Sequence, residues 1–298
     1  MSDLNFYRAF EERYRGSREV IKSRLEVYLP FILPLKQFDE TCQGIDLGCG
    51  RGEWLELMHE YGINVQGVDL DDLMLEACRE RSLKASSVDA IEALKALPNN
   101  SQLVVTGFHI AEHLQFSALQ TLMIEAFRVL KPGGLLILET PNPENIGVAT
   151  VNFYLDPTHQ RPLPPLLLTF LSEHCGFTQV KLIRLQEYKA LLDSPWVSIT
   201  DILEGVSPDY AVIAQKYAGG SLLSLNSEAF TKEYGIKPDE LARKFAQQAW
   251  QTNERISLAE AHARQTDLII NNILHSKSWR YTAPFRAIYR FFSSKPRQ

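Results

Sequence analysis

The chain has 298 residues, of which 45% are hydrophobic and 22% are charged, and its formal net charge is −5. This composition is typical of a globular protein with one sizeable core, and the negative charge argues against nucleic acid as a partner. The four cysteines show no C-x-x-C pair and no metal-like spacing, so we expect no structural zinc and reduced thiols in the cytoplasm. The polar N-terminus does not resemble a signal peptide, and no apolar run approaches the length of a membrane span.

Residues 1–40 are predicted to form an N-terminal helical cap. Ser17 is a typical N-cap residue, and the helix that follows it is expected to run to about Leu29. Pro30 then predicts a break, because proline removes a helical hydrogen bond. The run Arg15-Gly16-Ser17-Arg18 interrupts the helical pattern, which favours a lid over a site rather than a purely structural face.

Residues 41–218 alternate short apolar strands with helical stretches. Strands are predicted at 43–47, 64–68, 102–107 and 135–140, and helices at 53–61, 73–81 and 118–130. This alternation indicates an α/β fold in which helices cover both faces of a parallel sheet. The stretch between the later strands, 177–187 and 210–215, shows no clear helix, so we expect an antiparallel closing pair there.

Residues 219–275 are predicted to be a helical extension with a start at Pro238-Asp239. Apolar and small side chains recur along it at alternating steps of four and three, namely Phe245, Ala249, Thr252, Ile256, Ala259, Ala263, Thr266, Ile270 and Ile273. Such a heptad seam is typical of a coiled coil, but alanine and threonine bury little apolar area. Two alternatives therefore stay open, a coiled-coil homo-oligomer and a long helix packed on its own domain.

Residues 276–298 form a basic, aromatic tail without an acid. Its cations are Lys277, Arg280, Arg286, Arg290, Lys295 and Arg297, and its larger apolar residues are Trp279, Tyr281, Phe285, Ile288, Tyr289, Phe291 and Phe292. An amphipathic segment of this kind favours peripheral contact with an anionic surface, here the inner membrane. A partner-docking helix and a frayed tail are the alternatives.

The segment Asp46-Leu47-Gly48-Cys49-Gly50-Arg51-Gly52 follows a predicted strand and precedes a predicted helix. Glycines at such a turn let the backbone approach a ligand closely. A nicotinamide site would need G-x-G-x-x-G, but Glu53 stands where the last glycine would be. Asp46 lies two residues before the first glycine, where its carboxylate can hold the amino group of a methionine moiety. The pattern favours S-adenosylmethionine (SAM), with Asp46, Gly48 and Gly50 as contacts.

Two further acids follow the next strands. Asp69, with Leu70 beside it, lies 19 residues after Gly50, close to the spacing expected of an acid that grips ribose hydroxyls. Asp89 follows a weak strand, where its carboxylate can accept from the adenine amino group while the backbone of Ala90 reads the ring. Three acids after three successive strands indicate a single cofactor site.

The ordered motifs resemble those of class I SAM-dependent methyltransferases. They are the 46–52 loop, Val68-Asp69, Ser87-Val88-Asp89-Ala90, Phe108-His109-Ile110-Ala111-Glu112-His113 and Lys131-Pro132-Gly133-Gly134. The resemblance covers about residues 41–218. It implies a Rossmann-like fold with a mostly parallel seven-stranded sheet, and it adds Phe108 to the cofactor contacts. The N-terminal helical lid and the long C-terminal helix predicted above flank this fold. Glu112-His113 and Glu139-Thr140-Pro141-Asn142 are similar to ubiquinone-type O-methyltransferases.

The flanking segments are similar to bacterial methyltransferases encoded with polysaccharide biosynthesis enzymes, among them O-antigen chain-terminating methyltransferases. The similar segments are 6–11, 15–18, 153–159 and 278–284. This resemblance implies a saccharide or lipid-linked saccharide acceptor in lipopolysaccharide biosynthesis, and a complex with glycosyltransferases. Some chain terminators also carry a kinase domain, and the absence of a kinase signature in this sequence argues against a phosphate acceptor. The alternatives are a quinone or aromatic O-methyltransferase and a SAM-fold scaffold for glycosyltransferases, although the complete cofactor motifs count against the scaffold.

Two histidines are candidate general bases. A sugar hydroxyl is a poor nucleophile, so a base is expected, and histidine is suited to that role near neutral pH. His113 follows the fourth strand, where the carboxyl edge of the sheet opens onto the cofactor. His159 lies on a loop after the fifth strand that can close over substrate, and Asp156 and Arg161 beside it are predicted substrate contacts. No metal is predicted.

The N-terminal cap is predicted to complete the site, because a lid over the cofactor excludes water. Tyr7, Arg8, Tyr14 and Arg15 are the expected substrate contacts, and Arg18 is an expected cofactor contact. The alternative is a solvated helix that is stabilised by ion pairs within it.

Overall fold

The computed structural model describes residues 16–37, 39, 42–191, 193–217, 219 and 226–293. The chain divides into two compact units, residues 1–242 and 243–298. Four of the predicted lid contacts lie outside the described residues, namely Tyr7, Arg8, Tyr14 and Arg15. Among the helices that the structure describes, none combines the length and the apolar character needed to cross a membrane.

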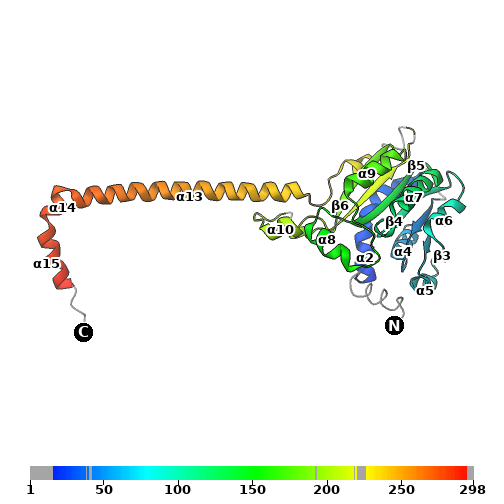
Figure 1. The fold of residues 1–298 in the computed structure, drawn as a ribbon, viewed down its shortest axis with the longest axis horizontal. Helices are drawn as coiled ribbons and strands as arrows, with labels where there is room; N and C mark the ends of the chain where they lie inside the picture. Colours follow the sequence, from blue (N-terminus) through cyan, green and yellow to red (C-terminus); the bar gives the residue numbers. More distant parts are fainter. Residues whose placement is uncertain are drawn as a thin grey trace. The chain divides into compact units, whose positions relative to one another are not determined.

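The described part of the first unit contains one sheet of seven strands (Figure 1). The strands are β1 (Gln43–Leu47), β2 (Asn64–Asp69), β3 (Ala85–Ser87), β4 (Gln102–Phe108), β5 (Leu130–Pro141), β6 (Gln179–Leu185) and β7 (Asp209–Gln215). Their order in the sheet is β3-β2-β1-β4-β5-β7-β6. The first five strands pair in parallel, whereas β7 is antiparallel to both β5 and β6. The prediction of a Rossmann-like, mostly parallel sheet is confirmed.

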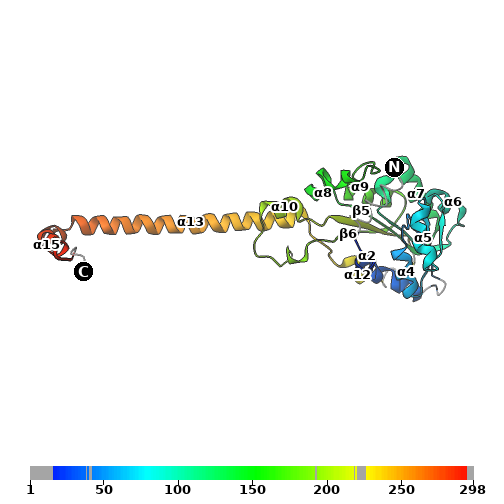
Figure 2. The ribbon, with the colours of Figure 1, turned by 90° about the horizontal axis from the view of Figure 1, so that it is seen from below.

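Each face of the sheet carries its own core, because successive side chains of a strand point to opposite faces. Leu135 and Ile137 of β5 belong to one cluster of buried residues, whereas Leu136 and Leu138 belong to the other. The helices divide in the same way, with α4 (Glu53–Glu60) and α5 (Asp72–Glu80) in the first cluster, and α6 (Ala90–Ala96), α7 (Phe116–Val129) and α9 (Pro165–His174) in the second. Figure 2 shows α4 and α9 on opposite sides of the sheet.

The N-terminal segment begins as predicted but continues differently. The side chain of Ser17 accepts a hydrogen bond from the amide of Val20, and this cap starts the first described helix. The break expected at Pro30 does not occur, because Pro30 lies in the first turn of a second helix, where its missing N–H costs no helical hydrogen bond. The elements are α2 (Arg18–Leu25), η1 (Glu26–Tyr28), α3 (Leu29–Ile32) and η2 (Leu33–Gln37).

The N-terminal segment is also part of the core of the first unit. Tyr28, Phe31 and Leu35 are completely buried in the cluster that contains α4. Phe31 packs edge to face on Phe230 of α12 (Ser227–Thr231), with ring centroids 5.3 Å apart. Removal of this much apolar surface from water stabilises the first unit, so residues 18–37 are more than a cap.

Residues 226–242 belong to the first unit, although the sequence predicts them to be part of the helical extension. The amide of Asn226 donates to the carbonyl oxygen of Phe31 (2.9 Å). Leu241, in the first turn of α13 (Pro238–His275), is buried in a small cluster with Leu191, Val197, Val206 and Ile236. The loss of strand signal marks the end of the sheet, but burial extends further along the chain.

The connections after β5 and β6 contain short helices that the sequence pattern does not resolve. They are α8 (Ile146–Thr150), η4 (Asn152–Leu155), η5 (Lys189–Leu191) and α10 (Ile199–Glu204). Ser198 and Asp201 form a reciprocal capping box at the start of α10, which explains a helix in the stretch expected to be irregular.

The second unit contains the rest of α13, followed by α14 (Lys277–Tyr281) and α15 (Ala283–Ser293). The predicted long C-terminal helix is confirmed. Of the heptad residues, Ile256 is 51%, Ile270 47% and Ile273 49% exposed in the single chain. The coiled-coil homo-oligomer stays a prediction.

The two-sided core makes a prediction about stability. Ile137→Ala removes a completely buried side chain from the centre of the sheet, so we expect the free energy of unfolding to fall by about 2–5 kcal/mol. Ile124→Ala, on the 58% exposed position of α7, is the matched control and is expected to change it by less than about 0.5 kcal/mol. Urea denaturation followed by circular dichroism measures both, and equal effects would contradict the assigned packing.

Candidate active site

The glycine loop after β1 is a tight turn at the carboxyl edge of the sheet. Gly48, Gly50 and Gly52 have φ angles of +70°, +51° and +77°, a region in which a side chain would be strained. Gly52 also serves as the N-cap of α4, and a Cβ there would lie 2.6 Å from the sulfur of Cys78. The loop therefore needs glycine for its conformation and for its packing.

Asp69 holds this loop to the end of β2. Its Oδ2 atom accepts from the amide of Gly50 (2.8 Å), and its Oδ1 atom accepts from the amide of Asp71 (2.8 Å). A carboxylate oxygen can accept more than one hydrogen bond, so Asp69 can still accept from ribose hydroxyls. Leu70, beside it, is 73% exposed, which offers an apolar surface for an adenosine group.

The other two predicted cofactor acids differ in their surroundings. Asp46 is buried, and its Oδ1 atom accepts from the hydroxyl of Thr106 (2.6 Å). Asp89 is exposed and caps α6, where Oδ1 accepts from the amides of Ile91 (2.9 Å) and Glu92 (3.1 Å). The capping role explains an acid at position 89 by itself, so a contact of Asp89 or Ala90 with adenine stays a prediction.

Arg18 supports the loop from the N-terminal segment. Its Nη1 atom donates to the carbonyl oxygen of Arg51 (2.8 Å), and its Nη2 atom donates to that of Gly52 (3.1 Å). Its Nε atom donates to Glu56 of α4 (2.5 Å). All three guanidinium nitrogens thus contact protein atoms, so Arg18 stabilises the conformation of the glycine loop. Direct contact of Arg18 with the cofactor stays a prediction.

Phe108, the remaining predicted cofactor contact, ends β4 next to the loop. It is partly buried, and its ring packs edge to face on Trp54, with centroids 5.1 Å apart, and at a tilt on Tyr28, 5.4 Å away. This aromatic cluster fixes the floor of the site between β4 and α4.

The structure brings the two predicted catalytic histidines together. The ring centroids of His113, on η3 (Ala111–His113), and His159 are 4.6 Å apart. The backbone joins the same segments, because the amide of Gln160 donates to the carbonyl oxygen of Glu112 (2.8 Å). The loop after β5 therefore closes against the end of β4.

Hydrogen bonds indicate the protonation of both rings. The Thr158 hydroxyl donates to Asp156 Oδ1 (2.6 Å), so its oxygen accepts from Nδ1–H of His113 (2.9 Å). Nδ1 of His159 donates to the carbonyl oxygen of Phe153 (2.6 Å). In the neutral form each histidine then carries its lone pair on Nε2. Burial lowers the pKa of His113, which favours this neutral form.

Glu112 is a buried carboxylate between the histidines and β5. Its Oε2 atom accepts from the Thr140 hydroxyl (2.9 Å), and its Oε1 atom lies 3.1 Å from Nδ1 of His109 and 4.0 Å from Nε2 of His159. Burial opposes ionisation, but the contact with His109 outweighs it and the pKa of Glu112 is lowered. Glu112 therefore places negative charge beside the rings of His109 and His159.

A second cluster of charged groups lies around His109. Nε2 of His109 is 3.5 Å from Glu139 Oε1, and the buried Tyr28 hydroxyl donates to Glu139. Burial raises the pKa of Asp209, at the start of β7, to about 7, although the charge of His109 opposes this. The side chain of His109 is 43% exposed; loss of part of its hydration opposes its charge, yet its contacts with Glu112 and Glu139 raise its pKa well above the ordinary value.

Comparison with known proteins identifies the family. The family described as Methyltransferase domain matches residues 45–138. The chain is 36% identical to a SAM-dependent methyltransferase of known structure from Archaeoglobus fulgidus, with a TM-score of 0.62 over 71% of this chain and 100% of that one. The chain belongs to the SAM-dependent methyltransferase family. Membership confirms the predicted class of enzyme and its cofactor, SAM.

The matches to two further relatives span a smaller share of those proteins. A probable SAM-dependent methyltransferase of Mycolicibacterium smegmatis is 34% identical over 139 residues, which are 46% of this chain and 53% of that protein. A ubiquinone biosynthesis O-methyltransferase of Psychrobacter arcticus is 29% identical over 189 residues, 58% of this chain and 70% of that protein. This chain spans about half the length of the mycobacterial relatives.

For a SAM-dependent methyltransferase, the residues at the loop fit the cofactor. The three positive-φ glycines form the tight turn at the end of β1, and the carboxylates of Asp46 and Asp69 beside it are acceptors for an ammonium group and for hydroxyls. Gly48, Gly50, Asp46 and Asp69 would hold SAM here, with Leu70 beside the adenosine. Their individual roles stay predictions.

The predicted substrate contacts Asp156 and Arg161 occupy the same loop as His159. Asp156 is buried and accepts from both the amide (2.8 Å) and the hydroxyl of Thr158. The guanidinium of Arg161 lies 4.7 Å from the ring centroid of Phe116 and is exposed. Asp156 thus positions His113 through Thr158, and a contact of either residue with substrate stays a prediction.

The histidine clusters also have the composition of metal sites. The first group consists of Glu112, His113 and His159; each offers one ligand atom, and these atoms lie within 4.8 Å of one another. The second group, His109, Glu139 and Asp209, meets the same condition. Imidazole and carboxylate together suit several divalent cations. The sequence prediction of no metal is therefore open to test.

Sequence reasoning did not assign Thr158, Glu112, Glu139 or Asp209 to the site. Glu112 and Glu139 lie within motifs that resemble those of known methyltransferases, so their motif positions are an available signal. Asp209 gave no such signal, because it reaches His109 only through the antiparallel pairing of β7 with β5.

Removal of the Asp69 carboxylate is expected to weaken cofactor binding. Asp69→Ala removes the acceptor that holds the Gly50 amide together with the predicted ribose contact, so the Kd for SAM should rise about ten- to a hundredfold. Isothermal titration measures it. Asp72→Ala, which removes an exposed acid from α5, is the control, and an unchanged Kd in Asp69→Ala would contradict the assignment.

Proposed function

We propose that this SAM-dependent methyltransferase transfers the methyl group to a hydroxyl oxygen, and that His113 is the general base. The observation that carries the proposal is the chain of hydrogen bonds from His113 through Thr158 to Asp156, which leaves Nε2 as the basic atom. Such a chain holds an imidazole in one tautomer and one orientation. A base with these two properties suits removal of a proton from a weak acid.

Bound SAM supplies an electrophilic methyl group on a positively charged sulfur. With SAM held by the glycine loop, its sulfonium would release the methyl group to the hydroxyl oxygen, and Nε2 of His113 would take the hydroxyl proton. The products are a methyl ether, S-adenosylhomocysteine and an imidazolium ion, which returns its proton to solvent. The buried charge of Glu112, in contact with the neighbouring His109 and near His159, stabilises positive charge that develops in this cluster.

We propose a saccharide hydroxyl, on a surface polysaccharide or its lipid-linked precursor, as the acceptor. An alcohol is a much weaker acid than a phenol, whose pKa is about 10, so it depends more on a positioned base. The resemblance of segments 6–11 and 153–159 to polysaccharide-associated methyltransferases supports the same acceptor. A complex with glycosyltransferases at the inner membrane belongs to this proposal.

A phenol or quinol acceptor is the second candidate. It is favoured by the similarity to ubiquinone biosynthesis O-methyltransferases, which covers 58% of this chain in the Psychrobacter arcticus protein. The scaffold alternative has no observation in its favour, since the loop geometry suits SAM.

An acceptor assay separates the candidates. We incubate the full chain with methyl-labelled SAM and either lipid-linked saccharide extract or a set of catechols. Label in a sugar methyl ether, identified by mass spectrometry after hydrolysis, is the expected result. Label confined to the catechols would overturn the saccharide proposal and leave the hydroxyl proposal intact.

His113→Gln tests the base. We expect kcat to fall about 10²- to 10⁴-fold, while the Kd for SAM stays unchanged. His174→Gln, on an exposed position of α9, is the control and should retain full turnover. Equal turnover in both variants would remove His113 from the mechanism.

The pH dependence of the wild-type enzyme follows from the direction of the His113 pKa. Burial lowers this pKa below the ordinary value of 6.5, and the neutral ring is the active form. We therefore expect the acid limb of kcat to have its midpoint below pH 6.5. An acid limb centred above pH 6.5 would assign the limb to another group.

Chelation tests the alternative role of the same cluster. Because Glu112 already binds Thr140 and contacts His109, we expect turnover to be unchanged after dialysis against EDTA. Loss of turnover that Mg²⁺ or Zn²⁺ restores would instead assign Glu112, His113 and His159 to a metal.

A further inference from the structure

We infer that α14 and α15 form a binding site for the surface of an anionic lipid bilayer. The inference concerns the second unit alone and is independent of the acceptor. It rests on three features of residues 276–293: a two-faced helix, a concentration of cations, and a hollow lined by arginine.

The helix α15 separates its apolar and cationic residues. At about 100° per residue, Phe285, Ile288 and Phe291 fall on one stripe, whereas Arg286 and Arg290 fall together on another face. Phe285 and Phe291 are each 73% exposed, and Ile288 is 57% exposed. An exposed apolar stripe of this length on a helix too short and too polar to span a bilayer fits the interface between lipid headgroups and chains.

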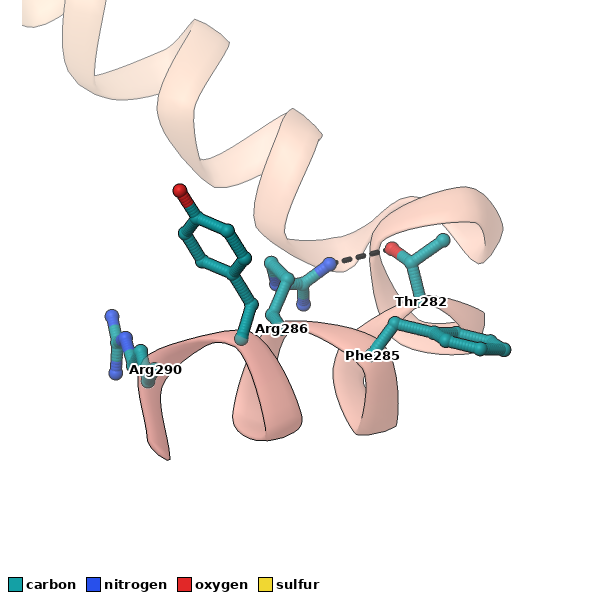
Figure 3. Close-up of a pocket in the computed structure, with 5 residues that line it drawn as sticks. Thr282, Phe285, Arg286 and Arg290 are labelled. Carbon is teal, nitrogen blue, oxygen red and sulfur yellow. Dashed lines mark hydrogen bonds between the residues drawn. The ribbon is translucent and has the colours of Figure 1, made fainter. Parts of the chain in front are cut away.

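The arginines face a hollow at the turn between α14 and α15. Thr282, Phe285, Arg286, Tyr289 and Arg290 line a hollow of about 310 Å³ (Figure 3). Arg286 donates to the Thr282 hydroxyl (2.5 Å) and to the carbonyl oxygen of Trp279 (2.7 Å). The Thr282 hydroxyl itself donates to the carbonyl oxygen of Ser278 (2.8 Å), so it is the two guanidinium groups beside apolar rings that suit the phosphates of lipid headgroups.

Trp279 of α14 contacts α15, so the combination of aromatic rings and cations extends into α14. Its ring lies 3.7 Å below the guanidinium carbon of Arg286, a cation–π contact. The hydroxyl of Ser276 accepts from the amide of Trp279 and so starts α14. Tyr281, at the end of α14, is 78% exposed. Amphipathic aromatic rings of this kind prefer the headgroup region of a bilayer.

The charge distribution identifies the partner. The chain as a whole has a net charge of −5, yet no acid follows residue 275. On α13, by contrast, cations alternate with acids, as in the pair Arg264–Glu260. An anionic membrane combines negatively charged headgroups with apolar acyl chains beneath them. A helical segment that carries cations and exposed aromatic rings complements both layers, whereas an acidic protein offers the charge alone.

Sedimentation with vesicles tests the inference on the full chain. We use vesicles of phosphatidylcholine alone and of phosphatidylcholine mixed with phosphatidylglycerol. The protein should bind the anionic vesicles and lose that binding at high salt. Since each cation near such a surface contributes about fivefold, the double variant Arg286→Glu with Arg290→Glu should bind at least about twentyfold more weakly.

A second variant separates insertion from simple charge attraction. Phe285→Ser with Phe291→Ser keeps every cation, yet it should weaken binding more than about tenfold, because the apolar stripe no longer enters the bilayer. The matched control is Trp250→Ser with Arg255→Glu on α13, which removes one exposed aromatic ring and one cation and should bind as the wild type does. Circular dichroism confirms that the variants keep their helix content.

Three results would overturn the inference. They are absence of binding to either vesicle, equal binding to neutral and anionic vesicles, and retention of binding in both helix variants. Turnover with a soluble acceptor should be unchanged in all variants, so a failure of the proposed hydroxyl acceptor is distinguishable from a failure of membrane binding.

Discussion

Burial of the Glu112 carboxylate is the constraint on which the acceptor side of this methyltransferase depends. A charge that leaves water costs several kcal/mol unless it is hydrogen-bonded. Glu112 meets this requirement through Thr140 on β5 and His109 at the end of β4, and its backbone accepts from the loop that carries His159. The need to satisfy one buried group therefore joins β4, β5 and the loop after β5.

The same group organises the charges around the candidate base. Glu112 and Glu139 both contact His109 and raise its pKa, and Tyr28 donates to Glu139 from the N-terminal segment. His113, one residue after Glu112, instead has a lowered pKa because burial dominates its surroundings. The pKa values of two histidines four residues apart are thus shifted in opposite directions, and perturbed pKa values of this kind are common at functional sites.

The cofactor side depends on shorter-range interactions. Three glycines with positive φ, the cap at Gly52 and the Asp69 acceptor lie within one strand–loop–helix–strand unit. Because these contacts join neighbouring elements, local sequence specifies them almost completely. Arg18 adds one contact from outside the unit, which ties the N-terminal segment to the carbonyl oxygens of Arg51 and Gly52.

Local sequence specifies the strands, the glycine loop, the acids at strand ends and the long helix, since all of these follow from hydrophobic period and from backbone requirements within a few residues. It also named His113 and His159 separately. Only the tertiary structure brings these two rings, 46 positions apart in the chain, to a centroid separation of 4.6 Å, and only it places Tyr28 against Glu139 and Asp209 near His109. Residues 18–37, predicted as a cap, became core for the same reason. These contacts between distant residues depend on the antiparallel pairing of β5 with β7 and on the path of the loop after β5. No local sequence pattern encodes which distant side chains will contact the same buried carboxylate.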